Sequence, residues 1–262
     1  MCFNTKRIVS FLLIFTLLFS SSVCSAKSRT MYTKKPLKVK GKVIPQYYKV
    51  NVKLVKVKKH ELKKTSAAME GIQQPVDVPV DEGFLPNIII LKPHDYFTWI
   101  LPKKTEVKIG KYKGKISTKD LTKKKPKAVV KKIPYNTFKS YMSYRAITST
   151  SSPQYKLQRK ACTDGDTGVR MVDGRYCIAV GPKVATKIGT KLDLIYKSGK
   201  IVPAIVADQK GGTVDGYRHG DGSAVEFVVD NSALPRCAKR AGDMSALDEF
   251  KGRITKVKVY KK

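Results

Sequence analysis

Apolar and lysine residues alternate with a period of two in the first half of the chain, at Leu37–Lys40 and Val50–Val57. That period is typical of half-buried antiparallel strands, because an amphipathic helix needs apolar residues three and four apart. The pattern predicts a small, basic, β-rich module over residues 27–134. Its further strand-like runs are Ile88–Leu91, Tyr96–Leu101 and Val107–Ile109.

Two segments interrupt this module. Residues 65–86 contain no Lys or Arg, four acidic residues and prolines at 75, 79 and 86, which is typical of an exposed linker. Residues 123–134 are rich in Lys and Pro and predict a hinge. We therefore expect a domain boundary near residue 134.

The second half of the chain contains short apolar runs separated by turn residues such as Asp173-Gly174 and Ser198-Gly199. Ser152-Pro153 predicts the start of a short helix, and a second helix is expected at Ser232–Arg240. Many short strands with tight turns favour a mainly β fold and a closed barrel over residues 138–262. The expected strands are Tyr176–Val180, Lys191–Tyr196, Ile201–Ala207, Ala224–Val229 and Arg253–Tyr260.

The N-terminus has the features of a secretory signal peptide. Lys6 and Arg7 precede the apolar run Ile8–Phe19, and Cys24-Ser25-Ala26 fits the small-residue pattern before a cleavage site. The run is shorter than the roughly 20 residues that span a bilayer, so we expect cleavage after residue 26 rather than an anchor. The mature protein is then secreted, extracellular or associated with the cell wall, with no stable membrane span.

The net charge of the chain is +33, and most of the excess lies in its first half. Residues 27–140 have a net charge of +21 and residues 141–262 a net charge of +10. Such an excess favours polyanionic partners. Outside a cell these are anionic wall polymers, acidic lipid headgroups or nucleic acid.

Cysteine and histidine usage gives no support for a metal site or a cofactor. Cys162, Cys177 and Cys237 remain after cleavage, which allows one internal disulfide at most, and none belongs to a C-x-x-C pair. His219 and the two other histidines, at positions 60 and 94, are far apart in the sequence.

An ordered set of motifs lies in the second half: Ile178–Val180, then Ile188–Leu194, then Ile205–Asp208 followed by Gly211-Gly212. This set resembles the double-psi β-barrel of the three-aspartate domain. That domain occurs in murein lytic transglycosylase A and in exported proteins that remodel the cell wall. The resemblance spans residues 138–262, does not reach residues 27–134, and implies a six-stranded barrel with short helices that acts on peptidoglycan.

The three carboxylates of that family are only partly retained. The first position is Gly181, the second is Asp208, and the third corresponds to Glu226 after an insertion at about residues 213–222. By this resemblance Asp208 is the candidate catalytic acid, and Glu226 orients the substrate or stabilises charge. Lys210 and the polar insertion residues Asp215, His219 and Asp221 are candidates for substrate binding.

Glycoside cleavage needs a proton for the leaving oxygen and stabilisation of an oxocarbenium-like centre. A hydrolase uses two carboxyl groups, whereas a lytic transglycosylase manages with one, because the 6-hydroxyl of muramic acid is the nucleophile. The alternative is purely structural. Asp208 would then cap a turn before the glycines, Glu226 would face solvent, and the insertion would be a solvated loop.

Three functions remain open from the sequence. The first is a peptidoglycan lytic transglycosylase or glycoside hydrolase held near the wall by its basic module. The second is a non-catalytic protein that binds or loosens the wall, favoured by Gly181. The third is an extracellular polyanion binder, for which we expect nucleic-acid affinity with a steep dependence on salt.

Overall fold

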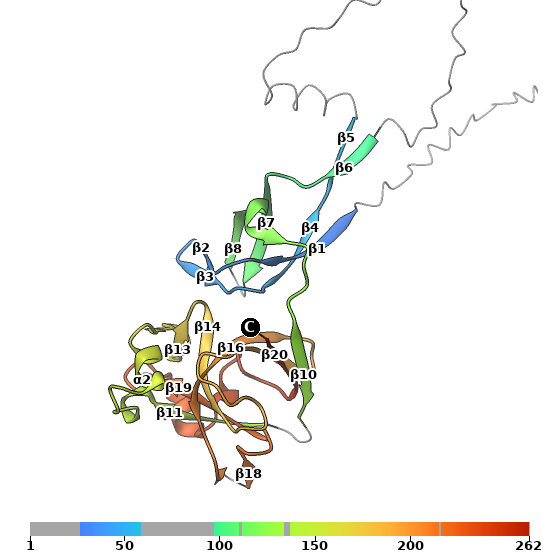
Figure 1. The fold of residues 1–262 in the computed structure, drawn as a ribbon. Helices are drawn as coiled ribbons and strands as arrows, with labels where there is room; N and C mark the ends of the chain where they lie inside the picture. The colour runs from blue at the N-terminus through green and yellow to red at the C-terminus, as the bar shows by residue number, and fades with distance from the viewer. Residues whose placement is uncertain (1–26, 59–96, 110–111, 134–136, 215, 262) are drawn as a thin grey trace, which may run out of the picture.

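The computed structural model describes residues 27–58, 97–109, 112–133, 137–214 and 216–261. The described chain is mainly β, with a few short helices. Figure 1 shows small sheets from the first half of the chain lying against a larger sheet from the second half. The predicted signal peptide (1–26), the predicted linker (65–86) and the expected strand at Ile88–Leu91 lie outside the described residues.

Within its described residues, the N-terminal part contains one three-stranded sheet and three two-stranded sheets. Strands β1 (Ser28–Thr33), β4 (Lys49–Lys53) and β9 (Leu121–Thr122) form the first, in the order β4-β1-β9. The alternation noticed in the sequence is seen directly in β4, where Val50 and Val52 are buried while Asn51 between them and the two flanking lysines are exposed. The two-stranded sheets are β2 (Leu37–Val39) with β3 (Lys42–Ile44), β5 (Val55–Lys58) with β6 (Phe97–Ile100), and β7 (Lys104–Ile109) with β8 (Tyr112–Ser117).

These small sheets enclose a hydrophobic core of their own. Its buried members come from β1, β3, β4, β7, β8 and β9, so the β2–β3 and β7–β8 sheets are stabilised by packing against their neighbours rather than alone. A 3-10 turn, η2 (Thr118–Asp120), leads from β8 to β9. The buried members are Met31, Ile44, Val50, Val52, Val107, Ile116 and Leu121.

The large sheet has nine strands. Its main path has the order β10-β20-β15-β16-β14-β13-β12, and β19 and β11 extend from β14. Two pairs are parallel, β14 with β16 and β11 with β19, whereas the others are antiparallel. The strands are β10 (Ala128–Lys132), β11 (Phe138–Ser143), β12 (Cys162–Thr163), β13 (Arg170–Val172), β14 (Arg175–Val180), β15 (Lys191–Tyr196), β16 (Ile201–Gln209), β19 (Ala224–Val229) and β20 (Ile254–Tyr260).

The expected closed barrel is not seen in the described residues, because the hydrogen-bonded order ends at β10 on one side and at β12 and β11 on the other. The edge of β20 with which a closing strand would pair is already paired with β10. This strand is also a correction to the predicted hinge at residues 123–134. Five consecutive residues of that segment pair in antiparallel register with β20.

Both predicted short helices are present, the second with a shifted start, and the structure adds short turns that were not predicted. Helix α2 (Pro153–Gln158) begins after Ser152, whose hydroxyl accepts a hydrogen bond from the N–H of Tyr155. Helix α3 (Arg236–Ala241) begins later than expected, after Pro235, and ends at Gly242 in the left-handed conformation. The remaining turns are η3 (Tyr144–Ala146) and η4 (Met244–Ala246), and β17 (Thr213–Val214) pairs with β18 (Tyr217–Arg218) in the insertion.

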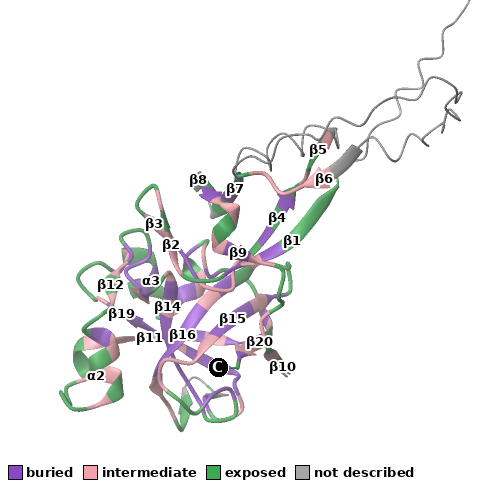
Figure 2. Cartoon of the chain, turned by 45° about the horizontal axis from the view of Figure 1, so that its top comes forward, coloured by how far each residue is buried: buried purple, intermediate pink, exposed green. Residues whose placement is uncertain are grey.

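Hydrophobic clusters lie on both faces of the large sheet. The main core contains Ile178, Val206 and Phe227 among others, and a smaller cluster contains Cys177, Ala207 and Val228 together with Leu157 of α2. Because neighbouring residues of one strand belong to different clusters, the two clusters lie on opposite faces. Figure 2 shows the buried residues concentrated on β14, β15 and β16, while α2 carries mostly exposed and intermediate residues, with Gln158 buried.

The N-terminal part contacts the large sheet through polar groups and close backbone packing. Arg175 donates from Nη2 to the carbonyl oxygen of Gln46 at 2.7 Å, and Lys42 forms an ion pair with Asp164 at 3.1 Å. Gly174 lies so near Val43 that a Cβ there would be 2.3 Å from the carbonyl oxygen of Val43. In the described part of the chain no helix is long and apolar enough to cross a bilayer.

Candidate functional site

Asp208 and Glu226, the two candidate catalytic carboxylates, lie in one row across three adjacent strands. Asp208 in β16 is paired with Ala179 in β14, and Ala179 is paired with Glu226 in β19. Adjacent strands are about 4.8 Å apart, so the two backbones are about 10 Å apart. The residue between the carboxylates is an alanine, so no long side chain separates them.

A β-bulge determines the direction of Asp208. The register between β14 and β16 shifts after Ile178, which pairs with Val206, so that Ala207 is an extra residue before Asp208. Val206 belongs to the main core, and simple alternation would direct Asp208 to the same core. The extra residue instead leaves Asp208 on the opposite face, as expected for a bulge.

Helix α2 covers that opposite face, and its first turn contacts the row. Gln154 donates from Nε2 to Oδ1 of Asp208 at 3.5 Å, and Asp208 is half-buried. Glu226 is directed to the same face, because its neighbours Val225 and Phe227 both belong to the main core. The two carboxylates therefore share a face of the sheet.

Glu226 does not simply face solvent. Its side chain is only 14% exposed, and its Oε2 lies 3.2 Å from Nζ of Lys210, whose side chain is 32% exposed. Lys210 follows β16 directly, and its backbone N–H donates to the carbonyl oxygen of Val180. The same row continues to Ser140 in β11, which is paired with Glu226 and is itself buried. This face of the sheet thus brings together the carboxylate of Asp208, the ion pair of Glu226 with Lys210, and the neutral polar side chains of Gln154 and Ser140.

Gly181 has no room for the carboxylate that the family resemblance places at this position. A Cβ on Gly181 would lie 1.9 Å from the carbonyl oxygen of His219. The insertion therefore packs its backbone directly against the end of β14. Any residue other than glycine at this position requires the insertion to move.

The polar residues of the insertion have separate positions. Asp221 accepts a hydrogen bond from the N–H of Ser223 at 2.8 Å, and its hydrogen bonds with Ser223 hold the pKa of its carboxyl below the usual range. This geometry is that of a turn-capping aspartate. His219 is only 5% exposed, so its ring is not displayed as a solvent-accessible substrate contact. Asp215 lies outside the described residues.

The three cysteines at 162, 177 and 237 are all free thiols. Cys177 is buried in the smaller cluster, and burial raises the pKa of its thiol to about 12. Cys162 and Cys237 are exposed. Among the residues that the structure describes, no group of three or more His, Cys, Asp or Glu side chains is arranged to hold a metal ion.

Sequence reasoning did not find Gln154 and Ser140, although both belong to the row or contact it. Gln154 lies in a helix whose start was predicted, but the packing of α2 on β16 is a tertiary contact with no local pattern. Ser140 lies in β11, which pairs in parallel with a strand more than 80 residues later in the chain. No protein-family model matches this chain, and no curated protein or solved structure matches it either.

Proposed function

We propose that this chain is an exported protein that cleaves the glycan strands of bacterial peptidoglycan, with Asp208 as its proton donor and acceptor. The observation that supports this proposal most is the polar row on the α2 face. It brings Asp208, Glu226 and Lys210 to one side of the sheet, beside Gln154. Paired carboxyl groups on one surface are the usual requirement for glycoside cleavage.

Within this proposal, residues 138–262 are an open variant of the double-psi β-barrel. The two parallel pairs, β14 with β16 and β11 with β19, support that assignment, because parallel strands are unexpected in a sheet built only from hairpins. The extra edge strand β10 distinguishes the variant from a closed six-stranded barrel.

The proposed chemistry needs one titrating carboxyl group. Asp208 donates its proton to the glycosidic oxygen as the bond from C1 to that oxygen breaks, and the leaving sugar departs with a hydroxyl. The carboxylate then accepts the proton of the muramic acid 6-hydroxyl, whose oxygen bonds to C1 and closes the anhydro ring. Asp208 ends the cycle protonated, as it began.

Glu226 and Lys210 act as a positioning pair in this scheme. Lys210 holds Glu226 in a fixed direction at 3.2 Å, and the charges of the two groups offset one another locally. Their polar atoms lie on the same face as Asp208, where sugar hydroxyl groups accept and donate hydrogen bonds. Gln154 orients the carboxyl of Asp208 from α2.

Export and wall association complete the proposal. The residues that support export are the basic pair and apolar run before residue 26. The excess of positive charge in residues 27–140 supports anionic wall polymers as partners of the N-terminal part.

The test is digestion of purified sacculi with analysis of soluble products by mass spectrometry. We expect the wild-type protein to release anhydro-muropeptides and Asp208→Asn to release none, because the amide has no transferable proton. Asp248→Asn is the matched control, since Asp248 is exposed and distant in sequence from the row. Product release by Asp208→Asn at the wild-type rate, with an unchanged unfolding midpoint, would exclude Asp208 from the chemistry.

A second function, wall binding without cleavage, is favoured by the environment of Gly181. The missing first carboxylate is not merely substituted, because the insertion occupies the space of its side chain. This function predicts that wild-type protein and Asp208→Asn sediment with sacculi equally and that neither releases soluble products.

A further inference from the structure

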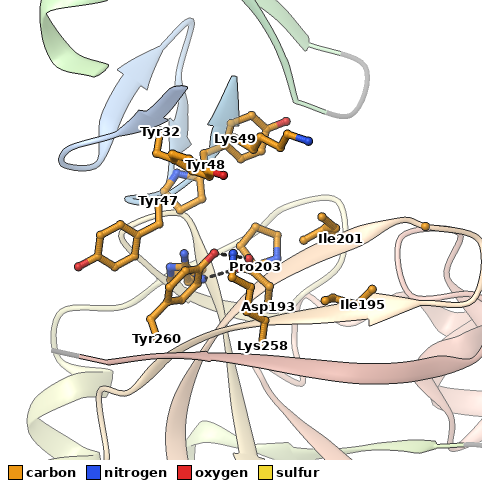
Figure 3. A pocket seen from close by; sticks show the side chains of 13 residues that line it. Tyr32, Tyr47, Tyr48, Lys49, Asp193, Ile195, Ile201, Pro203, Lys258 and Tyr260 are labelled. Atoms are coloured by element: carbon orange, nitrogen blue, oxygen red, sulfur yellow. Dashed lines mark hydrogen bonds and ion pairs between the residues drawn. The ribbon is translucent and has the colours of Figure 1, made fainter. Parts of the chain in front are cut away.

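A cleft lies between the N-terminal sheets and the outer face of the large sheet, and the carboxylate row does not contribute to it. Its volume is about 500 Å³, within the range of small-molecule sites. Figure 3 shows Tyr32, Tyr47, Tyr48 and Lys49 on the N-terminal side, facing residues of β15, β16 and β20. The lining residues from the large sheet are Arg175, Asp193, Ile195, Gly199, Ile201, Pro203, Lys258 and Tyr260.

The floor of the cleft is a row of paired residues on the face opposite to the main core. Asp193 of β15 is paired with Pro203 of β16 on one side and with Lys258 of β20 on the other. Ile195 and Ile201 form the next row, and Ile201 is 51% exposed although it is a large apolar residue. The floor thus offers apolar surface beside charged groups.

A buried polar network fixes the deepest part of the floor. Arg175, 1% exposed, donates to Oδ1 of Asp193 at 3.0 Å, and the hydroxyl of Tyr260 donates to Oδ2 of Asp193 at 2.5 Å. Arg175 also donates to the carbonyl oxygen of Gln46, so the same residue holds the N-terminal wall. The two walls are therefore connected before any ligand enters.

In the N-terminal wall of the cleft, the ring of Tyr47 is positioned by an unusual backbone conformation. Tyr47 has a φ of 69°, in the left-handed region that a bulky side chain rarely adopts. Its N–H donates to the carbonyl oxygen of Thr33, and its ring lies 4.8 Å from that of Tyr260 between centroids. Backbone strain of this kind is concentrated at ligand-binding positions.

Positive charge surrounds the opening of the cleft. Lys49 is exposed, and Lys258 lies 4.8 Å from the centre of the Tyr260 ring. Burial lowers the pKa of Lys258, and the nearby Lys125, Arg175 and Lys49 lower it further, while Asp193 raises it. An anionic ligand would reduce this crowding of like charges.

We propose that this cleft binds a segment of an acidic glycan, with sugar rings packed on the half-buried Tyr32 and Tyr47 and carboxylates paired with Lys49 and Lys258. Tyrosine provides a flat apolar ring with a hydroxyl that binds sugar hydroxyl groups. The choice of a glycan rests on the proposed function. The location and the aromatic and cationic character of the site come from the cleft itself.

The test is calorimetric titration of the Asp208→Asn protein, in which catalysis is blocked, with three probes. These are a galacturonic acid hexamer, a neutral N-acetylglucosamine hexamer and a single-stranded thymidine 12-mer. We expect the acidic hexamer to bind most tightly. Tyr47→Ala should lower the affinity for the acidic hexamer about ten-fold, because an aromatic anchor is removed, whereas Tyr47→Phe retains the ring and most of the affinity. Tyr155→Ala, a tyrosine of α2 outside the cleft, is the matched control.

Lys49→Gln is the second variant, and its exposed position makes misfolding unexpected. It should remove most of the preference for the acidic over the neutral hexamer, while Lys115→Gln, an exposed lysine of β8, leaves that preference unchanged. Equal affinity in Tyr47→Ala, Lys49→Gln and their controls would overturn the proposal. Tighter, Tyr47-dependent binding of the thymidine 12-mer would overturn the glycan assignment.

The result of this binding test can be distinguished from the result of the sacculus digestion. If sacculi are cleaved but these variants bind the hexamer normally, the cleft proposal fails and the catalytic one stands. If the hexamer binds through Tyr47 and Lys49 but sacculi yield no products, the cleft belongs to a wall-binding protein without catalysis.

Discussion

Replacing Arg175 by methionine tests how the N-terminal part is joined to the large sheet. The guanidinium is buried and donates to the carbonyl oxygens of Leu192, Ala204 and Gln46 as well as to Asp193. Arg175→Met removes all of these donors and leaves the charge of Asp193 buried, with only Tyr260 still donating to it. Breaking a buried pair in this way destabilises a protein by roughly 3–5 kcal/mol.

This loss is a large fraction of the roughly 5–15 kcal/mol that stabilises a typical domain. The assay is equilibrium denaturation in urea, followed by circular dichroism and by fluorescence of Trp99, the single tryptophan of the chain. Trp99 lies in β6 and reports on the N-terminal part. We expect coincident transitions in the wild-type protein, and an earlier fluorescence transition in Arg175→Met, because the contact to Gln46 is lost.

A double-mutant cycle separates the ion pair from the other contacts of Arg175. Asp193→Asn removes the charge that Arg175→Met leaves unpaired, so the double variant should lose less stability than the sum of the two single losses, by about 1–3 kcal/mol. Arg236→Met, at an exposed position in α3, is the matched control and should change stability by no more than about 0.5 kcal/mol. A loss below about 1 kcal/mol in Arg175→Met, or strict additivity in the cycle, would refute the reasoning.

The further predictions concern Cys177 in β14 and Gly181, which directly follows that strand. At pH 8, iodoacetamide should alkylate Cys162 and Cys237 in the folded protein, whereas Cys177 should react only after unfolding. Peptide mass spectrometry measures this labelling, and labelling of Cys177 in the folded protein would contradict its burial. Because the pKa of Cys177 is raised from 9.0 to about 12, the folded state holds this proton longer than the unfolded state, so this thiol's contribution to stability falls as pH rises from 9 towards 12. Gly181→Ala should lower the thermal unfolding midpoint, because its Cβ would clash with the carbonyl of His219 and overpacking costs about 1–3 kcal/mol. The control is Gly211→Ala, which has open space around its Cβ. An unchanged midpoint in Gly181→Ala would mean that the insertion moves without cost.

Local patterns predicted the elements that depend on neighbouring residues. The strands β14, β15 and β19 follow from short apolar runs bounded by turn dipeptides, and α2 follows from Ser152-Pro153. The mainly β class is confirmed for the same reason, since period-two alternation in β4 is a property of consecutive residues.

Features that depend on distant residues were not predicted. Strand β10 lies in a Lys- and Pro-rich segment, and only its pairing with β20, more than 120 residues later, makes it a strand. The register shift that directs Asp208 towards α2 arises between two strands and leaves no mark on either sequence. The tyrosine cleft joins residues near position 47 with residues near position 260, although each aromatic residue looks unremarkable in its own segment.

Strand β10 also determines where the chain can be shortened. A fragment that starts at residue 138 would keep eight strands of the large sheet but uncover the backbone of β20, from Lys256 to Tyr260. Uncovered strand edges of this kind recruit other chains and promote aggregation. A soluble fragment for crystallisation or labelling should therefore begin upstream of Lys127, whose carbonyl oxygen accepts the last backbone hydrogen bond of this pairing, from Lys261.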